Sequence, residues 1–554
     1  MNIDWKTLEP ELSRPLLQGG VGQVHLLGIA NTALTLAVQG GERARAEELF
    51  QLGGDALLAA WEHACLDAST AGQVTALHAA YPTRFRLAPQ ILAVLAAVRD
   101  SAHQPANLEY LRRLLRRRET EKLFRYLESQ RTEGPSEEVL FWSSQAMMVG
   151  LYEGEFDRAR EWLLADVRMP QPLRARYLGD VAFARGAYAD AAEAYAESLS
   201  GLPLAGTMVR RATALDRIGE YHEARAMWRS AARIRPWCVN TLLRLYDAET
   251  GMDRETCLPE GQGAVLLYTW NKAAYLDLAL QSMAESDIGA TRLIVLNNGS
   301  TDDTAGVLDK WREHLGTGRM AVETLPVNVG APAARNWLMG LPALDDCRWV
   351  AYLDDDAIVP SDWLGRFGAA MRAYPQAWVW GCKVVNHDNP TVFQAVDLHL
   401  EEGGEMIVPQ GVEPYHRRFG VSDLHHQELD FGWFDYVRPC VSVTGCAHLF
   451  LRDSLRRHGG FDLRFSPSQY DDLEHDLRGA LQKTLPVYTG HLRVRHMKRT
   501  GRATRTDSGQ MSNAQGNMYK LQLKYTAEEF AAMRRHDEAA AQADLLAKLS
   551  RIAE

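Results

Sequence analysis

The stretch that decides the fold is WVAYLDDD, residues 349–356. Its apolar part is long enough for one buried strand, and it ends abruptly in three consecutive carboxylates. Three adjacent acids repel one another unless a cation or a cationic side chain compensates their charge. Carboxylate oxygens are hard ligands that suit Mg²⁺ or Mn²⁺, and these ions favour phosphate as a further ligand. The stretch therefore indicates a metal site that handles phosphate, with a solvated acidic turn as the alternative.

The composition is that of a large protein with several domains. The 554-residue chain is several times longer than a typical domain, and its net charge of −10 argues against a general nucleic-acid binder. Its seven cysteines are scattered and lack a CxxC pair, so neither a disulfide framework nor a zinc site is expected. The sequence also lacks a signal-peptide pattern and a run of about 18 apolar residues. We therefore expect a cytoplasmic protein without a transmembrane segment.

The N-terminal half has apolar residues at helical spacing from about residue 21 to residue 235, which predicts an all-α region. Within it, three glycines are spaced by 32 and 33 residues, and each is followed by an aromatic residue and then an alanine at fixed offsets: Gly154, Phe156 and Ala159; Gly186, Tyr188 and Ala191; Gly219, Tyr221 and Ala224. Glycine permits a tight turn, and alanine allows two helices to approach closely. These segments resemble tetratricopeptide repeats, most clearly over residues 140–236.

The resemblance to repeats implies a helical solenoid over residues 1–240, followed by a linker at 241–262. Such solenoids commonly hold an extended peptide or another protein on a curved surface. A scaffold for packing or dimerisation is the alternative, and the sequence leaves open whether the protein forms a homo-oligomer.

After residue 263 the pattern changes to alternating strands and helices. We expect strands at 264–268 and 292–296 and helices at 276–286 and 302–314, which predicts an α/β domain with a mostly parallel sheet. Ligands of such sheets bind beyond the carboxyl ends of the strands. Polar residues follow three of the expected strands there, including the acidic triplet.

Seven short motifs in this half occur in a specific order: YTWN (268–271), IVLNNGSTD (294–302), NVGA with ARN (328–336), LDDD (353–356), TG (444–445), GGFD (459–462) and YDDLE (470–474). Together they resemble the family 2 glycosyltransferases, whose GT-A fold is a Rossmann-like α/β arrangement. The resemblance covers residues 263–525 and leaves 526–554 as short helices that form a C-terminal cap. It implies an enzyme that transfers a hexosyl or related sugar from a nucleotide-sugar donor.

The resemblance also implies a set of residues that bind the nucleotide-sugar: Thr269, Asn271, Asn297, Asn328, Arg335, Asn336, Asp354 and Asp355. Asn297 stands where an Asp commonly recognises uracil in the family. An amide both donates and accepts hydrogen bonds, whereas a carboxylate only accepts, so the nucleobase stays open, with a UDP-sugar as the first choice. The asparagines could instead form ordinary turns.

The acidic triplet takes the family's DxD role under the same resemblance. Asp356 would bind the Mn²⁺ or Mg²⁺ that bridges the donor phosphates, and Asp354 would face the ribose or the water shell of the metal. His496, on an expected strand at 492–496, is implied as a third metal ligand. The specific role of Asp355 is not assigned.

A second acidic pair begins an expected helix, where the helix N-terminus favours ionised acids. By the resemblance, Asp472 is the base that removes the acceptor proton in an inverting reaction, with Asp471 as the second choice. A charge pair that only stabilises the helix is the alternative. The basic stretch 497–512 is either a lid over the donor or a surface loop, and segment 386–435 is where acceptor specificity is expected.

These features together predict a metal-dependent inverting glycosyltransferase. Its acceptor would be a hydroxyl-type nucleophile on a protein or peptide recruited by the repeat domain. A lipid-linked or polysaccharide acceptor is the first alternative. An inactive binding scaffold is the second, and the intact acids argue against it.

Overall fold

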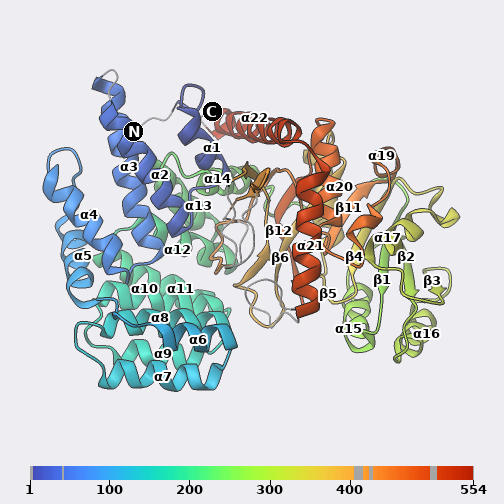
Figure 1. Cartoon of the computed structure of the whole chain (residues 1–554), viewed down its shortest axis with the longest axis horizontal. Coiled ribbons are helices and arrows are strands. Elements are labelled where there is room, and N and C mark those ends of the chain that lie inside the picture. The colour runs from blue at the N-terminus through green and yellow to red at the C-terminus, as the bar shows by residue number, and fades with distance from the viewer. Residues whose placement is uncertain are drawn as a thin grey trace. The chain divides into compact units, whose positions relative to one another are not determined.

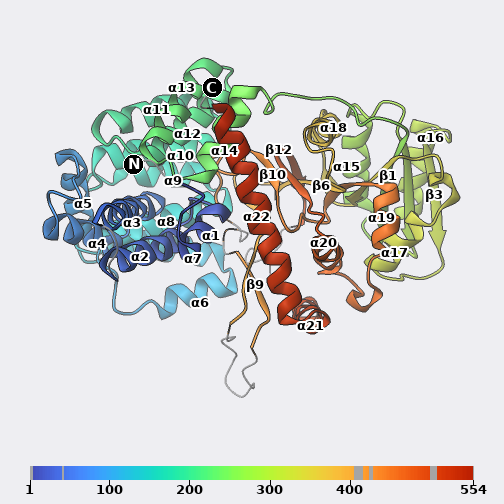
Figure 2. The same cartoon turned by 90° about the horizontal axis from the view of Figure 1, so that it is seen from above.

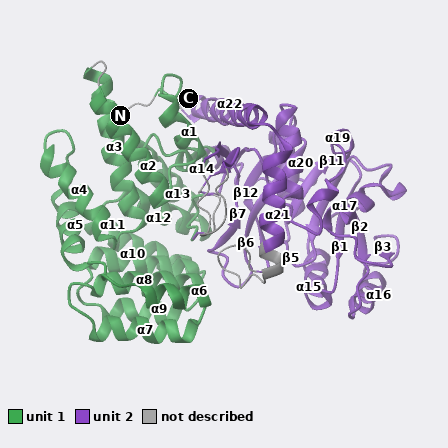
Figure 3. Ribbon diagram, viewed as in Figure 1, with its two compact units in different colours: residues 1–246, 429–433 green, residues 247–428, 434–554 purple. Residues whose placement is uncertain are grey.

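The computed structural model describes residues 4–39, 43–404, 416–422, 424, 428–498 and 508–552. It divides the chain into two compact units (Figure 3). Unit 1 comprises Met1–Tyr246 together with Leu429–Trp433, and unit 2 comprises Asp247–Glu428 and Phe434–Glu554.

The regular elements of unit 1 are helices throughout its described part, most of them packed against their neighbours along the chain (Figure 1). In order they are α1 Pro10–Gln18, α2 Gln23–Gln39, α3 Arg43–His63, α4 Ala68–Ala80, α5 Pro89–Ser101, α6 Glu109–Arg117, α7 Thr120–Glu133, α8 Val139–Glu153, α9 Phe156–Ala165, α10 Gln171–Ala184, α11 Tyr188–Gly201, α12 Ala205–Arg217, α13 Tyr221–Ile234 and α14 Val239–Thr250. The predicted all-α N-terminal region is confirmed.

The three repeated glycines lie in the turns after α8, α10 and α12. Gly154, Gly186 and Gly219 have φ angles of 80°, 79° and 88°, a left-handed conformation that favours glycine. The alanines five residues later are fully buried where paired helices meet. The turn and close-packing roles predicted for these residues are confirmed, and the unit is consistent with a helical repeat.

Unit 1 also contains the short stretch Leu429–Trp433, which is separated in sequence from its helices. The Phe431 ring lies 5.5 Å from that of Phe183, and the Arg210 guanidinium lies 4.7 Å from the centre of the Phe431 ring. Asn240 donates a side-chain hydrogen bond to the Trp433 carbonyl at 3.1 Å. The helices thus hold a piece of polypeptide through aromatic contacts and a bond to its backbone.

Unit 2 is built on a mixed sheet with strand order β10-β12-β6-β11-β4-β1-β2-β3, to which β5 and β7 add at β12 and β6. Strands β3, β2, β1 and β4 are parallel, and β11 runs antiparallel between β4 and β6. The strands are β1 Gly263–Thr269, β2 Arg292–Asn298, β3 Met320–Leu325, β4 Trp349–Asp354, β5 Ala357–Ile358, β6 Val379–Asn386, β7 Phe393–Ala395, β10 Val437–Pro439, β11 Ala447–Leu451 and β12 Val487–His496, with a separate pair β8 Leu400–Glu402 and β9 Phe419–Val421.

Helices cover both faces of this sheet (Figures 1 and 2). They are α15 Ala273–Ala284, α16 Thr304–Leu315, α17 Ala331–Met339, α18 Trp363–Ala373, α19 Arg452–His458, α20 Asp471–Leu481, α21 Ser508–Lys524 and α22 Ala527–Ile552. Helices α15, α16 and α18 share a hydrophobic core with one sheet face, which includes Leu353 and Phe367. On the other face, Tyr352 of β4 packs edge-on against Phe461, with ring centroids 5.7 Å apart. The predicted α/β fold with C-terminal helices is confirmed.

Strand register brings the predicted polar clusters to one edge. Tyr268 of β1 pairs with Asp354 of β4, and Thr269 pairs with Asn297 of β2. Because these strands are parallel, the loops after their carboxyl ends lie next to one another. This edge positions the candidate site.

The C-terminal region differs from the prediction in one place. Residues 499–507 of the predicted loop 497–512 lie outside the described residues, but helix α21 already begins at Ser508. Leu521 of α21 is fully buried in a cluster with Phe530 of α22, and this packing stabilises a helix that local periodicity did not reveal. Loop prediction at the end of that stretch was therefore wrong.

Across the described residues, none of the helices has the length and apolar character needed to cross a lipid bilayer.

Candidate active site

The acidic triplet at the end of β4 is compensated in part by a lysine. Lys272 Nζ lies 2.8 Å from Asp355 Oδ1 and 2.8 Å from Asp356 Oδ2. Burial lowers the pKa of Lys272, but the two carboxylates outweigh this effect and raise it. Lys272 stands in the loop between β1 and α15, so strand order brings it to the triplet. Asp355, whose role the sequence left open, thus holds this lysine.

The other two acids differ in charge environment. Burial raises the pKa of Asp354 to about 6; Arg335 opposes the rise, and Asp356 adds to it. For Asp356, burial is outweighed by His496 and Lys272, which hold its pKa below the usual range. Asp356 is therefore the stronger anion of the pair, which suits the innermost ligand of a cation.

The orientation of His496 is set by its neighbours. The Gln394 side-chain amide donates to the carbonyl of Lys498 at 3.0 Å, so its NH₂ group is identified and its Oε1 must accept. That oxygen lies 2.8 Å from His496 Nδ1, which consequently carries a proton and donates it. His496 Nε2 lies 2.9 Å from Asp356 Oδ1, and this carboxylate oxygen accepts the hydrogen bond. A divalent cation bound here would replace that proton and take Nε2 as a ligand.

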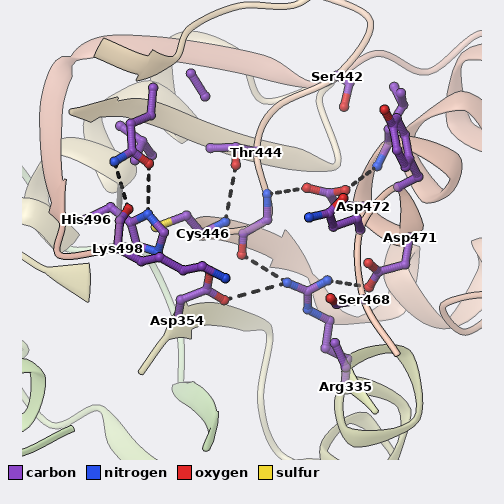
Figure 4. A pocket seen from close by; sticks show the side chains of 18 of the residues that line it. Arg335, Asp354, Ser442, Thr444, Cys446, Ser468, Asp471, Asp472, His496 and Lys498 are labelled. Atoms are coloured by element: carbon purple, nitrogen blue, oxygen red, sulfur yellow. Dashed lines mark hydrogen bonds and ion pairs between the residues drawn. The ribbon is translucent and has the colours of Figure 1, made fainter. Parts of the chain in front are cut away.

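Cys446, the residue just before β11, completes a group of possible metal ligands. One ligand atom each from Asp354, Cys446 and His496 lies within 4.8 Å of the other two, and among the described residues this is the one such group of three. Figure 4 shows Cys446 beside His496, with Asp354 below them. A carboxylate, an imidazole and a thiol, with Asp356 adjacent, form a donor set that fits a divalent cation.

A second acidic region lies across the same cavity, around Arg335 (Figure 4). Arg335 is buried; it bonds to Asp471, donates to the Gly445 carbonyl at 3.2 Å and lies 3.8 Å from Asp354 Oδ1. Burial raises the pKa of Asp471, and Arg335 opposes the rise. Arg335 thus links the metal-side acid to helix α20.

Asp472 has a different environment from its neighbour. Its Oδ2 accepts from the Gly445 N–H at 2.7 Å and its Oδ1 from the Leu473 N–H at 2.8 Å. Two backbone N–H groups, one from the loop before β11 and one from the first turn of α20, thus hold this carboxylate in place. Asp472 is only partly buried, so it remains available to a substrate.

One cavity of about 1150 Å³ contains both acidic regions. Its lining includes most of the predicted site residues: Asn271, Asn328, Arg335, Asp354, Asp355, Asp356, Asp471, Asp472 and His496. It also includes Trp270, which is 49% exposed, and Lys272. The structure therefore brings the predicted metal, base and nucleotide residues together.

Three predicted nucleotide contacts lie outside this lining. Thr269 is fully buried in β1, and Asn297 Oδ1 accepts from the Ser300 N–H at 3.0 Å within a turn. Asn336 pairs with the backbone of Phe461 through two hydrogen bonds of 2.8 and 2.7 Å. The asparagines thus stabilise the loops that surround the cavity.

The lining residues that were not predicted from sequence include Trp270, Lys272, Gln394 and Cys446. Trp270 and Lys272 belong to the polar cluster predicted after β1, so their place in the sequence could have indicated that they line the site. Gln394 and Cys446 gave no such signal, because Gln394 is 102 residues from His496 and Cys446 is 50 residues from His496 and 92 from Asp354.

Residues 264–435 match the family model described as "Glycosyl transferase family 2". The chain carries a family 2 glycosyltransferase domain. The predicted resemblance is confirmed for this part, which contains the acidic triplet and the loops after β1 and β2. Asp471, Asp472 and His496 follow the matched residues in sequence and complete the same cavity.

Three solved structures are distantly similar to the chain that carries this glycosyltransferase domain. They are GalNAc-T7 with UDP, GalNAc and Mn²⁺ (12% identity, 47% of each chain, TM-score 0.34), TarS of S. aureus (16% identity, 41% of this chain and 36% of that one, TM-score 0.28), and the mannosyltransferase PcManGT of Pyrobaculum calidifontis with GDP-Man and Mn²⁺ (14% identity, 57% and 87%, TM-score 0.34). The chain spans less than half the length of the first two, and nothing about activity is carried over from these similarities. Among curated proteins, none matches the sequence.

Proposed function

We propose that this chain is a metal-dependent glycosyltransferase that moves a sugar from a nucleoside-diphosphate donor to a hydroxyl group of an acceptor. The observation that carries the proposal is one cavity lined by two separate acidic centres: Asp354, Asp356 and His496 form one, and Asp472 belongs to the other. The family 2 domain supports the reaction class. A single acidic cluster would explain only metal binding. With two centres, one can stabilise the leaving group and the other can activate the nucleophile.

The donor is proposed to lie along the loops after β1, β2 and β3. Trp270 offers an exposed ring on which a base or a sugar face can stack, next to Asn271 and Asn328 in the cavity lining. Asn297 stands where the family commonly has an Asp, but it lies outside the cavity lining. This difference therefore gives no direct evidence on which nucleobase the donor carries. A UDP-sugar stays the first donor to test.

A divalent cation, Mn²⁺ or Mg²⁺, would be held by Asp356, His496 and Asp354, and when bound it supplies positive charge to the departing diphosphate. Lys272 bonds to Asp355 and Asp356 and supplies positive charge to both, and Gln394 keeps His496 Nε2 directed toward Asp356. These contacts thus position the proposed metal ligands before the donor binds.

Asp472 is proposed as the base. As the acceptor oxygen forms its bond to the anomeric carbon, its proton passes to Asp472, and the bond from that carbon to the diphosphate oxygen breaks. Asp471 is the poorer candidate because it is buried against Arg335. One base and one direct displacement give inversion at the anomeric carbon.

The acceptor is proposed to be a protein or peptide recruited by the helical unit. The observation in favour is that this unit already holds one stretch of polypeptide through Phe183, Arg210 and Asn240. A lipid-linked or polysaccharide acceptor is the second candidate. All seven cysteines are described and none forms a disulfide, which supports a reducing, cytoplasmic setting.

The test measures sugar transfer and donor binding on the full-length protein. A panel of nucleotide-sugars is screened by thermal shift with and without Mn²⁺, since a bound ligand stabilises the folded state. Asp472→Asn should keep donor-dependent and Mn²⁺-dependent stabilisation but lower kcat by roughly 10²–10⁴-fold. Asp303→Asn, at the start of α16 and outside the cavity lining, is the matched control. Normal turnover by Asp472→Asn would show that the base is another residue.

The acceptor class is tested separately. Transfer of radiolabelled sugar to protein in a cell extract should require residues 1–240, whereas slow donor hydrolysis should not. Label in lipid or polysaccharide, with none in protein, favours the second acceptor candidate.

A further inference from the structure

We propose that the Cys446 thiolate is a ligand of the metal site, so that the site binds thiophilic divalent ions such as Zn²⁺ and Co²⁺ in addition to Mn²⁺ or Mg²⁺. The inference rests on the proposed metal-dependent function and adds a ligand to it. It also revises the expectation from cysteine spacing, which gave no reason to place a zinc site anywhere in the chain.

The backbone holds Cys446 directly beside the acidic triplet. The Asp354 N–H donates to the Cys446 carbonyl at 2.8 Å, and the next residue, Ala447, pairs with Leu353 across the antiparallel strands β11 and β4. His496 ends β12 and pairs with Ala357, just after the triplet. The ends of β4 and β12 and the residue just before β11 thus converge, and each contributes one ligand side chain.

The side-chain geometry is close to that of a bound site. The ligand atoms of Asp354, Cys446 and His496 lie within 4.8 Å of one another. In a tetrahedral zinc site, ligand atoms are separated by roughly 3.3–3.8 Å. Movements of about 1 Å, within the range of side-chain rotation, bring the three atoms onto one ion. The site also lines the cavity, so an ion can enter it.

The donor chemistry separates two classes of ion. Mg²⁺ and Mn²⁺ prefer carboxylate, phosphate and water oxygens, whereas a thiolate favours Zn²⁺ and Co²⁺. One carboxylate, one imidazole and one thiolate form a donor set typical of zinc, and three protein ligands leave a position for an outside ligand. The thiol releases its proton as the metal–sulfur bond forms. We therefore expect Zn²⁺ to compete with Mn²⁺ for this site.

The other six cysteines do not form such a group with acids and histidines among the described residues. Cys440 is a suitable control because it is fully buried in the same unit and its Sγ lies 3.2 Å from the Ser442 carbonyl. A serine at position 440 can keep that hydrogen bond, so Cys440→Ser removes a thiol without removing its contact.

The direct test uses Co²⁺ as the probe on metal-free, full-length protein. A thiolate bound to Co²⁺ gives a charge-transfer absorption in the near ultraviolet, a signal that does not depend on activity. We expect this band in the wild type and in Cys440→Ser and its loss in Cys446→Ser. Titration calorimetry should show Zn²⁺ affinity reduced roughly 10-fold or more in Cys446→Ser and Mn²⁺ affinity changed by less than about 3-fold.

The outcomes distinguish this inference from the proposed function. If the wild type binds Mn²⁺ but shows no thiolate band with Co²⁺, the role of Cys446 is overturned and the proposed function is not. The same holds if the band persists in Cys446→Ser. Absence of Mn²⁺ binding to the wild type contradicts metal-dependent transfer, while the wild-type Co²⁺ spectrum still answers whether the thiol binds a metal. The wild-type spectrum needs no variant to fold.

Discussion

Lys272 partly neutralises the charge of Asp355 and Asp356 when no metal is bound, and the substitution Lys272→Met tests this role. Methionine keeps most of the length and the apolar contacts of the lysine stem but carries no charge. The substitution removes two charge-assisted hydrogen bonds of 2.8 Å to Asp355 and Asp356, whose side chains are 9% and 2% exposed. Two buried carboxylates then lose their shared partner.

The expected loss of stability follows from these contacts. A hydrogen bond to a charged group contributes about 1.5–3 kcal/mol, and solvent screens part of this because the lysine side chain is one-third exposed. Proton uptake by the acids limits the loss further. We expect unfolding of unit 2 to be easier by about 2–4 kcal/mol, which for a unit of this size lowers Tm by roughly 3–6 °C.

Differential scanning fluorimetry without metal and at saturating Mn²⁺ checks the prediction. The ion supplies positive charge to the same carboxylates, so Mn²⁺ should raise the Tm of Lys272→Met more than that of the wild type. Lys310→Met is the matched control, because Lys310 pairs with Asp277 at the surface and should change stability by less than about 1 kcal/mol. If Mn²⁺ stabilises Lys272→Met no more than the wild type, lysine and metal do not neutralise the same acids.

Three further perturbations test other parts of the structure. Gln394→Leu removes the acceptor that orients His496, so Mn²⁺ affinity measured by calorimetry should fall roughly 10–100-fold; unchanged affinity would contradict that role. Burial raises the pKa of Asp476 well above the ordinary carboxyl value, so the folded state keeps a proton that the unfolded chain releases, and stability falls with rising pH by up to about 1.4 kcal/mol per pH unit. Asp476→Asn does not titrate, so its Tm relative to the wild type should increase from about pH 5 to about pH 8; an unchanged difference would show that Asp476 is ionised in the fold. Phe431→Ala removes a ring that is 3% exposed and should destabilise unit 1 by about 3–5 kcal/mol in urea unfolding, whereas a change below about 1 kcal/mol would show that the ring adds little.

Local sequence predicted the elements of this protein well where apolar periodicity was strong. The strand that ends in the acidic triplet, the strands and helices that precede it and the glycine turns of the helical unit were all found in the structure. Helix α21 was not predicted, because its stability comes from packing of Leu521 against α22 rather than from its own pattern.

Side-chain direction was harder to predict than element type. Thr269, Asn297 and Asn336 stand in motifs that surround the cavity, yet Thr269 is fully buried and the two asparagines bond to backbone groups of nearby loops. Neighbouring residues in a strand point to opposite faces, so a motif places a backbone at a site without deciding which of its side chains enters.

The sequence by itself determined which strands carry acids and in what order the motifs follow, because these depend on residues close together along the chain. Only the tertiary structure decided that Lys272 and Cys446 meet the triplet and that Gln394 holds His496, the histidine implied by the family resemblance. Gln394 and His496 are 102 residues apart, and Lys272 and Asp355 are 83 apart. Strand order and register bring them together, and both are set by packing of the whole sheet rather than by any local pattern.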